Sequence, residues 1–351
     1  MLAITLQDLR FRARQFAIAV IGAGLVFSMT LLLSGLSGGF SAEINQTVQG
    51  LGAKTWLLAT DGARGGIGSL PPIPMSLVRT VSRQPGVGRV DPVIVAGQAA
   101  QLPDGTSHGI NLIGYDPGGL GTPSKVSGHE VTGAGQAVVD TGLGIGVGQT
   151  LNVSGNLFDV VGTVSNQTLL GGIPNVFVTL SDAQAVVFNA RPLISAVLTT
   201  GTVVPVSSKY EWYSDTAIER ASLSQMANAV SSINSSRILM WIIAVIIVAA
   251  LVYVSALERT RDFAVLKALG SSSRLLFLGL AAQAVIVTLA AAIFAVIISN
   301  FMTGIFDERV DIPGSAFITL PISAIVVGII ASITALRRAI SADPAAAFAG
   351  P

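Results

Sequence analysis

Four long apolar runs constrain this chain more than any other feature. They are Phe16–Gly35, Ile238–Leu257, Leu275–Ile298 and Phe317–Leu336. Each reaches the roughly 20 residues that a helix needs to cross the hydrocarbon core of a bilayer. Of the 351 residues, 51% are hydrophobic and only 11% are charged, whereas soluble domains carry about a quarter charged residues. We therefore expect an α-helical membrane protein with four transmembrane helices at residues 16–35, 238–257, 275–298 and 317–336.

The first apolar run has a second interpretation, a cleaved signal peptide. Segment 1–15 places leucines at helical spacing in front of Arg10, Arg12 and Arg14, which is typical of an interfacial amphipathic helix. The apolar centre of a signal peptide usually has only about 7–15 residues. Because the run at 16–35 is longer, we expect an interfacial helix at 1–15 followed by a membrane span.

Basic residues near the ends of the spans predict the orientation. Cytoplasmic loops of membrane proteins are enriched in Lys and Arg. Arginines precede the first run, four basic residues lie within 258–274, and Arg337 and Arg338 open the tail at 337–351. Loop 299–316 is net acidic. We therefore expect both termini and segment 258–274 in the cytoplasm, and segment 36–237 outside.

Segment 36–237 is large enough for a folded domain. We expect loop through about Pro74 except for a strand at Lys54–Ala59, and strands separated by glycine turns further on. The expected β-rich pieces include Val138–Asp140, Thr150–Val153 and Phe158–Val164, and short helices are expected at Met75–Arg83 and Asp182–Val187. The prediction is a large α+β extracytoplasmic domain between the first and second spans.

The end of this segment, 214–237, predicts a stalk helix. Ser214 or Asp215 can cap it, and the residues expected on its apolar face are Ile218, Met226, Val230 and Ile233. No Pro or Gly interrupts it, so we expect it to run unbroken into the second span and carry motion between domain and membrane. A helix that simply packs on the domain would show the same apolar residues, and both interpretations stay open.

Segment 258–274, with the sequence ERTRDFAVLKALGSSSR, is a short charged stretch between two spans. At helical spacing Phe263, Leu266 and Leu269 form an apolar stripe. The charged residues around the stripe are Glu258, Arg259, Arg261, Asp262 and Lys267. A helix of this kind can dock into a groove on another protein, while an ordinary solvated loop is the alternative.

Motifs for catalysis are absent from the sequence. It holds no G-x-x-x-x-G-K-[ST], no G-x-S-x-G and no H-E-x-x-H, and it has no cysteine and only two histidines, His108 and His129. The apolar runs hold almost no ionisable residue, which argues against an ion-coupled carrier. A net charge of +1 does not favour a nucleic-acid partner. We expect no catalytic residue, no metal site and no cofactor in this chain.

The segment ERTRDFAVLKALGSSSR resembles the signature between the second and third spans of FtsX-like permeases, the MacB-type class of ABC transporter subunits. The tail ALRRAISADPAAAFA resembles the closing signature of that family, and the glycine-rich stretch ending in NLFDVVG resembles the MacB core domain. The resemblance implies that segment 258–274 is the coupling helix, seated in a cleft of a cytoplasmic ATPase. Phe263, Leu266 and Leu269 would be its buried contacts.

The resemblance also implies the partners and the location. ATP and Mg would be bound by two copies of the partner ATPase, and a second copy of this chain would complete a homodimer in the bacterial cytoplasmic membrane, surrounded by membrane lipid. Three functions remain open: export of an amphiphile, lipid or peptide, mechanical regulation of an envelope enzyme that would be a periplasmic partner, and sensing of a peptide antibiotic. The MacB-like module favours export by analogy, and a solute importer is a weaker alternative.

Overall fold

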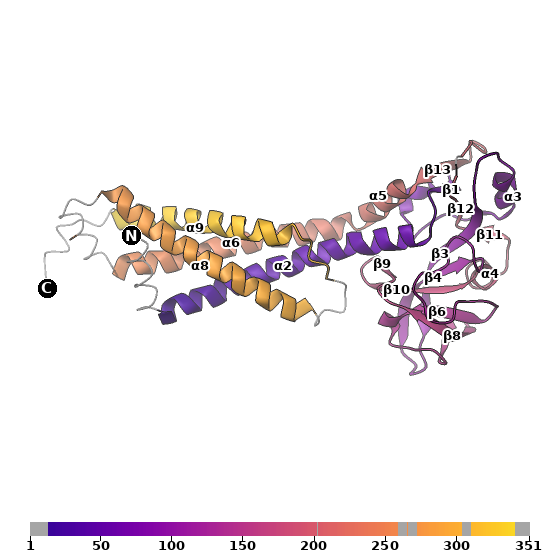
Figure 1. Cartoon of the computed structure of the whole chain (residues 1–351), viewed down its shortest axis with the longest axis horizontal. Coiled ribbons are helices and arrows are strands. Elements are labelled where there is room, and N and C mark those ends of the chain that lie inside the picture. Colours follow the sequence, from indigo (N-terminus) through magenta and orange to yellow (C-terminus); the bar gives the residue numbers. More distant parts are fainter. Residues whose placement is uncertain (1–12, 202, 259–264, 266–271, 304–309, 341–351) are drawn as a thin grey trace. The chain divides into compact units, whose positions relative to one another are not determined.

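The computed structural model (Figure 1) describes residues 13–201, 203–258, 265, 272–303 and 310–340. The chain divides into two compact units. We call them the membrane unit, Met1–Gly38 with Val230–Pro351, and the domain unit, Gly39–Ala229. Helices α2 and α6 contribute residues to both units.

The membrane unit is built from four helices that are long and apolar enough to cross a membrane. They are α2 (Ala13–Gly50), α6 (Ala227–Glu258), α8 (Ser273–Met302) and α9 (Ala316–Ile340). This confirms the predicted number and order of the spans. The predicted interfacial helix falls almost wholly on residues 1–12, outside the described part of the chain.

Small residues let these helices pack closely. Alanines from all four helices are fully buried at their common core, among them Ala23, Ala244, Ala284 and Ala324. Close packing of small residues is the usual way in which helices associate inside a membrane, where apolar side chains gain little by leaving lipid. The core of this unit is therefore built from small alanines together with larger side chains such as Phe27 and Leu31.

The domain unit is an α+β domain organised around one 11-stranded sheet. Nine of its strands follow the order β13-β1-β12-β3-β4-β10-β6-β8-β5, β7 pairs with β3 and β8, and β9 pairs with β10. Most pairs are antiparallel, but β4–β10 and β6–β8 are parallel. The strands of this sheet are β1 (Thr55–Ala59), β3 (Val90–Gln101), β4 (Ser107–Tyr115), β5 (Ser127–Gly128), β6 (Gln136–Asp140), β7 (Thr150–Val153), β8 (Asn156–Val164), β9 (Thr168–Leu169), β10 (Ile173–Thr179), β12 (Ala196–Thr199) and β13 (Tyr210–Ser214).

Strand alternation gives the sheet two apolar faces. In β1, Leu57 lies on one face, while Trp56 and Leu58 lie on the other. Helices α3 (Ser76–Ser82) and α4 (Leu180–Phe188) contribute to the core on the face of Leu57. The last turns of α2 and helix α5 (Asp215–Gln225) contribute to the opposite core. The remaining elements are η1 (Gly62–Gly65), η2 (Thr141–Leu143) and a two-stranded sheet of β2 (Ile73–Pro74) and β11 (Leu193–Ile194).

Most expected strands and short helices are present with shifted ends, and β7 has the predicted bounds. Two expectations are wrong. Residues 36–50, expected as loop, continue helix α2, because Phe40, Ile44 and Val48 recur every four residues and pack as a buried stripe.

The second wrong expectation is the unbroken stalk helix at 214–237. The structure ends α5 at Gln225 and begins α6 at Ala227. At Met226 the backbone N–H donates to the carbonyl oxygens of Leu223 and Ser224 instead of continuing the α-helical pattern. No Pro or Gly marks this break, so the sequence carries no local signal for it. The break instead follows the packing of α5 onto the domain.

Candidate functional site

The part of the domain unit most suited to a function is the junction where α2 and α5 pack on the sheet. We call it the helix–sheet junction and define it as residues 40–51 of α2, helix α5 and the turn between β9 and β10. The apolar side of α2 is buried here through Phe40, Ile44, Val48 and Leu51. Two polar residues of the same helix, Glu43 and Thr47, are only 1% and 3% exposed. Buried polar groups of this kind need specific partners.

The Glu43 carboxylate is bound by the turn between β9 and β10. Its Oε2 accepts hydrogen bonds from the backbone N–H groups of Gly171 (3.1 Å) and Gly172 (3.2 Å). Leu170, Gly171 and Gly172 all have positive φ, at 56°, 86° and 87°. Consecutive N–H groups in such a turn can converge on one anion. Glu43 therefore fastens α2 to this turn by charge-assisted hydrogen bonds, which are stronger than neutral ones.

One turn further along α2, Thr47 joins a chain of buried hydrogen bonds that runs from this helix to two neighbouring strands of the sheet. Its hydroxyl donates to the carbonyl oxygen of Thr168 (3.1 Å) and accepts from the side-chain amide of Asn175 (3.3 Å). The carbonyl oxygen of that amide accepts from Asn111 Nδ2 (3.2 Å), which also donates to the Ile173 carbonyl (3.1 Å). The chain connects α2 to β9, β10 and β4.

Helix α5 is fixed to the same core by a buried serine. Ser222 is fully buried. Its Oγ accepts from the backbone N–H of Ile67 (2.9 Å) and donates to the carbonyl of Ile218 (2.8 Å). Ile218 is itself fully buried in the core next to the sheet.

The start of α5 carries a second anchor. The indole N–H of buried Trp56 in β1 donates to Oδ1 of Asp215 at 2.6 Å. Burial raises the pKa of the Asp215 carboxyl, while the hydrogen bond from Trp56 opposes that shift. Ser214 caps the helix by accepting from the backbone N–H of Ala217 (3.3 Å).

The turn between β9 and β10 lies between α2 and the break at the end of α5. A Cβ placed on Gly171 would lie 3.5 Å from Phe40 Cε1 and 3.8 Å from Met226 Cε. The side-chain amide of Asn45 donates to Glu219 Oε1 (3.3 Å), which links the two helices directly. The junction thus holds α2 at the β9–β10 turn, and it holds α5 at Trp56 of β1 and at Ile67.

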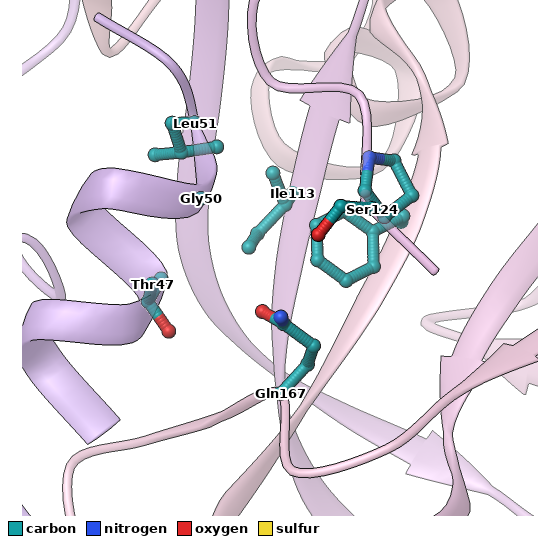
Figure 2. A pocket seen from close by; sticks show the side chains of 8 residues that line it. Thr47, Gly50, Leu51, Ile113, Ser124 and Gln167 are labelled. Carbon is teal, nitrogen blue, oxygen red and sulfur yellow. The ribbon is translucent and has the colours of Figure 1, made fainter. Parts of the chain in front are cut away.

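A small cleft lies at the end of α2, beside this junction (Figure 2). Figure 2 shows the side chains of Thr47, Gln167 and Ser124 around it. Its other lining residues are Gly50, Leu51, Ile113, Pro123 and Phe177. The space accepts about one water molecule. This cleft is too small for an amphiphile, and the polar contacts of the junction attach its helices to the rest of the domain.

The described residues bring no three His, Cys, Asp or Glu side chains together in a way that could hold a metal ion. Of the two histidines singled out in the sequence, His108 lies in β4 and His129 follows β5.

Most of the predicted coupling helix lies outside the described residues. Seven of its predicted contact residues belong to that part: Arg259, Arg261, Asp262, Phe263, Leu266, Lys267 and Leu269. Glu258 is described, as the exposed last residue of α6. Docking of this segment on an ATPase therefore stays a prediction.

The four predicted stalk residues are divided by the break. Ile218 belongs to α5 and Met226 is its half-buried C-cap. Val230 and Ile233 belong to α6 and lie in the membrane unit. Sequence reasoning missed Glu43, Thr47 and Ser222. The signal for the first two was their position beside Ile44 and Val48 on one helical stripe. It was missed because residues 36–50 were expected to form a loop.

Four membrane-length apolar helices with an α+β domain inserted between the first and second define a multi-span membrane protein with one large domain outside its spans. Comparison with known families identifies the class of membrane protein. The MacB-like periplasmic core domain matches residues 16–207, and the FtsX-like permease C-terminal region matches residues 235–344. The chain belongs to the FtsX-like permeases with a MacB-like core domain, and as such is a permease of the ABC transporter type in the cell membrane.

Two uncharacterized ABC transporter permeases of Mycobacterium tuberculosis strain H37Rv are similar over the full length of both chains. One is 35% and the other 36% identical over 352 residues, covering 100% of each chain.

Among solved structures, the periplasmic region of MacB from Actinobacillus actinomycetemcomitans aligns with a TM-score of 0.35 and 16% identity. The alignment covers 50% of this chain and 96% of that one. The extracellular domain of the transporter YknZ from Gram-positive bacteria aligns with a TM-score of 0.34 and 13% identity, over 46% of this chain and 98% of that one.

Proposed function

We propose that this chain is the non-catalytic permease subunit of an ABC transporter. It couples ATP hydrolysis by a separate cytoplasmic ATPase to a conformational change of its extracytoplasmic domain. The observation that carries the proposal is the attachment of α2, a helix of membrane-spanning length, to the sheet through the buried side chains of Glu43 and Thr47. A helix fastened to strands in this way moves them when it moves.

The ATPase partner is supported by the family and by the sequence. ABC transporter permeases work with an ATPase, and the sequence holds no phosphate-binding G-x-x-x-x-G-K-[ST] motif. Segment 258–274 connects α6 to α8 along the chain, and the basic residues near the span ends predict that it is cytoplasmic. We assign it as the coupling helix, with Phe263 as its main buried contact.

The substrate proposed is an amphiphile, a lipid or a peptide that is exported or extruded. The cleft beside the helix–sheet junction accepts only about one water, which supports handling of the substrate on domain surfaces rather than inside the junction. Two copies of this chain with two ATPase subunits form the assembly, since two-fold symmetry is the commonest solution for such complexes.

The test is co-expression with the candidate ATPase and reconstitution in nanodiscs. The Phe263→Ala variant is compared with wild type and with Val265→Ala, a control that shortens an apolar side chain of the same segment outside the Phe263, Leu266 and Leu269 stripe. Truncating a buried aromatic anchor costs roughly 2–4 kcal/mol at an interface. We expect Phe263→Ala to lose the bound ATPase or at least about 90% of its stimulated ATP hydrolysis, and Val265→Ala to retain both.

An ATPase that stays fully bound and stimulated in Phe263→Ala would refute the docking assignment. Failure of any ATPase to associate with the wild-type chain would refute the proposed function. ATP-driven change of the domain without movement of lipid or peptide would instead favour mechanical regulation of an envelope enzyme.

A further inference from the structure

The helices of the membrane unit are fastened to one another unequally. Helix α2 meets α8 at a glycine: a Cβ on Gly24 would lie 2.5 Å from Phe294 Cδ1 and 3.1 Å from the Ala291 carbonyl oxygen. Helix α9 meets α8 at Gly328, where a Cβ would lie 3.1 Å from Val285 Cα. Real Cβ atoms rarely come so close, so at both places the backbones approach as only glycine permits.

The segment that leads into α9 is fastened to α2 as well. The backbone N–H of Asp311 donates to the carbonyl oxygen of Gly35 at 2.9 Å. A Cβ on Gly35 would lie 2.5 Å from Val310 Cγ1, and one on Gly38 would collide with the Asp311 carbonyl oxygen. Two glycines one turn apart thus seat residues 310–313 on α2. Together with the contacts at Gly24 and Gly328, this seat joins α2, α8 and α9.

Helix α6 lacks contacts of this kind among the described residues. Its most apolar window is 22% buried, against 50% for α2, 44% for α8 and 39% for α9. A Cβ placed on Gly22 of α2 would lie 3.9 Å from Cγ2 of Ile247 in α6, which is ordinary van der Waals contact. A ring contact with α2 joins Phe27 and Trp241, whose centroids are 5.4 Å apart, and Leu251 packs against Phe16 and Ala19.

The buried stripe of α6 is narrow and smooth. It consists of Ala244, Val248, Val252 and Ala256, one residue per turn. The hydroxyl of Ser255 is buried and has no hydrogen-bond partner within the described part of the chain. The opposite side of α6 is exposed at Ile238, Ile242 and Ile246, where lipid tails would replace one another at little cost as the helix moves.

We infer that α2, α8 and α9 move together as one frame and that α6 shifts along this frame. This rests on the proposed function for its driving force, because α6 leads directly into segment 258–274. Sliding of a packed helix along its neighbours is a known form of conformational change. Small side chains without interlocking glycines suit such sliding, whereas the glycine contacts of the frame hold α2, α8 and α9 to one another.

Paired cysteines test the inference directly, because the chain has no native cysteine. Gly22→Cys with Ile247→Cys ties α6 to the frame, and Gly35→Cys with Val310→Cys ties two parts of the frame together as the matched control. Val310→Cys also removes the carbon that a Cβ at Gly35 would crowd. Disulfides need Cβ atoms about 3.5–4.5 Å apart, and each single variant reports on folding.

In the ATPase complex, we expect oxidation of the α6 pair to lower ATP turnover at least tenfold, with recovery on reduction. We expect the frame pair to change turnover less than twofold. Full turnover with α6 cross-linked, or equal inhibition by the frame pair, would overturn the inference. If a second copy of the chain already immobilises α6, its cross-link would leave ATP turnover unchanged. That result would also overturn the inference.

A second measurement needs no ATPase and therefore separates this inference from the proposed function. In the permease alone, a sliding α6 lets Gly22→Cys capture Ile243→Cys or Leu251→Cys, one turn on either side of Ile247, at slower but measurable rates. Exclusive capture at Ile247 would refute the sliding of α6, whatever the ATPase does. Absence of ATPase binding with capture at all three positions would refute only the proposed function.

Discussion

Replacement of Glu43 tests the attachment of α2 to the sheet. Its Oε2 receives two backbone hydrogen bonds, from Gly171 and Gly172, and its side chain is 1% exposed. Hydrogen bonds to charged groups each contribute about 1.5–3 kcal/mol. Because both bonds share one oxygen, we take about 2–3 kcal/mol for the pair. Glu43→Ala should therefore increase local opening of the turn between β9 and β10 about 30-fold to 160-fold, at 1.36 kcal/mol per factor of ten.

The Glu43→Gln variant separates charge from geometry. Its amide oxygen can accept both hydrogen bonds, and neutral hydrogen bonds are about half as strong as charge-assisted ones. We expect a loss of about 1 kcal/mol, which is roughly fivefold in opening. Glu219→Ala is the matched control, because this carboxylate bonds Asn45 at the exposed side of the same junction. It should change opening of the turn less than about twofold.

The assay is hydrogen exchange of the full-length chain in nanodiscs, read by mass spectrometry on peptides that span residues 168–174. The exchange rate of the Gly171 and Gly172 amides reports their opening directly. Unchanged exchange in a folded Glu43→Ala variant would refute the idea that Glu43 holds this turn. Equal effects of Glu43→Ala and Glu219→Ala would show general loosening in place of a specific anchor.

Three further changes follow from the described contacts. Ser222→Ala leaves the backbone N–H of Ile67 without its acceptor, so thermal unfolding should show a loss of about 1–3 kcal/mol, and no loss would contradict this anchor. Asp215 has its pKa raised by burial above 3.8, so the folded state favours the protonated acid. Its stabilising effect is present below pH 3.8 and is lost as pH rises through the folded pKa. Asp215→Asn, which can still accept from Trp56, should remove this loss of stability with rising pH. A variant whose stability falls with pH as the wild type's does would contradict this account. Gly328→Val should destabilise the membrane unit in detergent by about 1–3 kcal/mol through overpacking against α8, and unchanged stability would show that the backbone contact is not tight.

Features that depend on one stretch of sequence could be predicted. The four spans follow from apolar length, since a bilayer demands about 20 residues per helix. The strand at Thr55–Ala59 follows from a short apolar run, and β7 follows from alternation and flanking turns. The extension of α2 to Gly50 could also have been predicted from the spacing of Phe40, Ile44 and Val48, but its polar residues resemble those of a loop.

Features that depend on distant residues could not be predicted. Glu43 meets Gly171 across 128 positions, and Ser222 meets Ile67 across 155. No local pattern specifies such partners. The break at Met226 is of the same kind, because α5 is held by the domain core through Ile218 and not by a helix-stop residue.

The most direct test of ATP-driven coupling is hydrogen exchange in the complete complex. The permease and its ATPase would be compared in nanodiscs with and without a non-hydrolysable ATP analogue, following the peptides that contain residues 168–174 and Met226. We predict that the analogue changes exchange in both peptides by at least about threefold, and that Phe263→Ala abolishes the change while Val265→Ala preserves it. Identical exchange with and without the analogue, in a complex that binds it, would contradict transmission of the ATPase cycle to this domain.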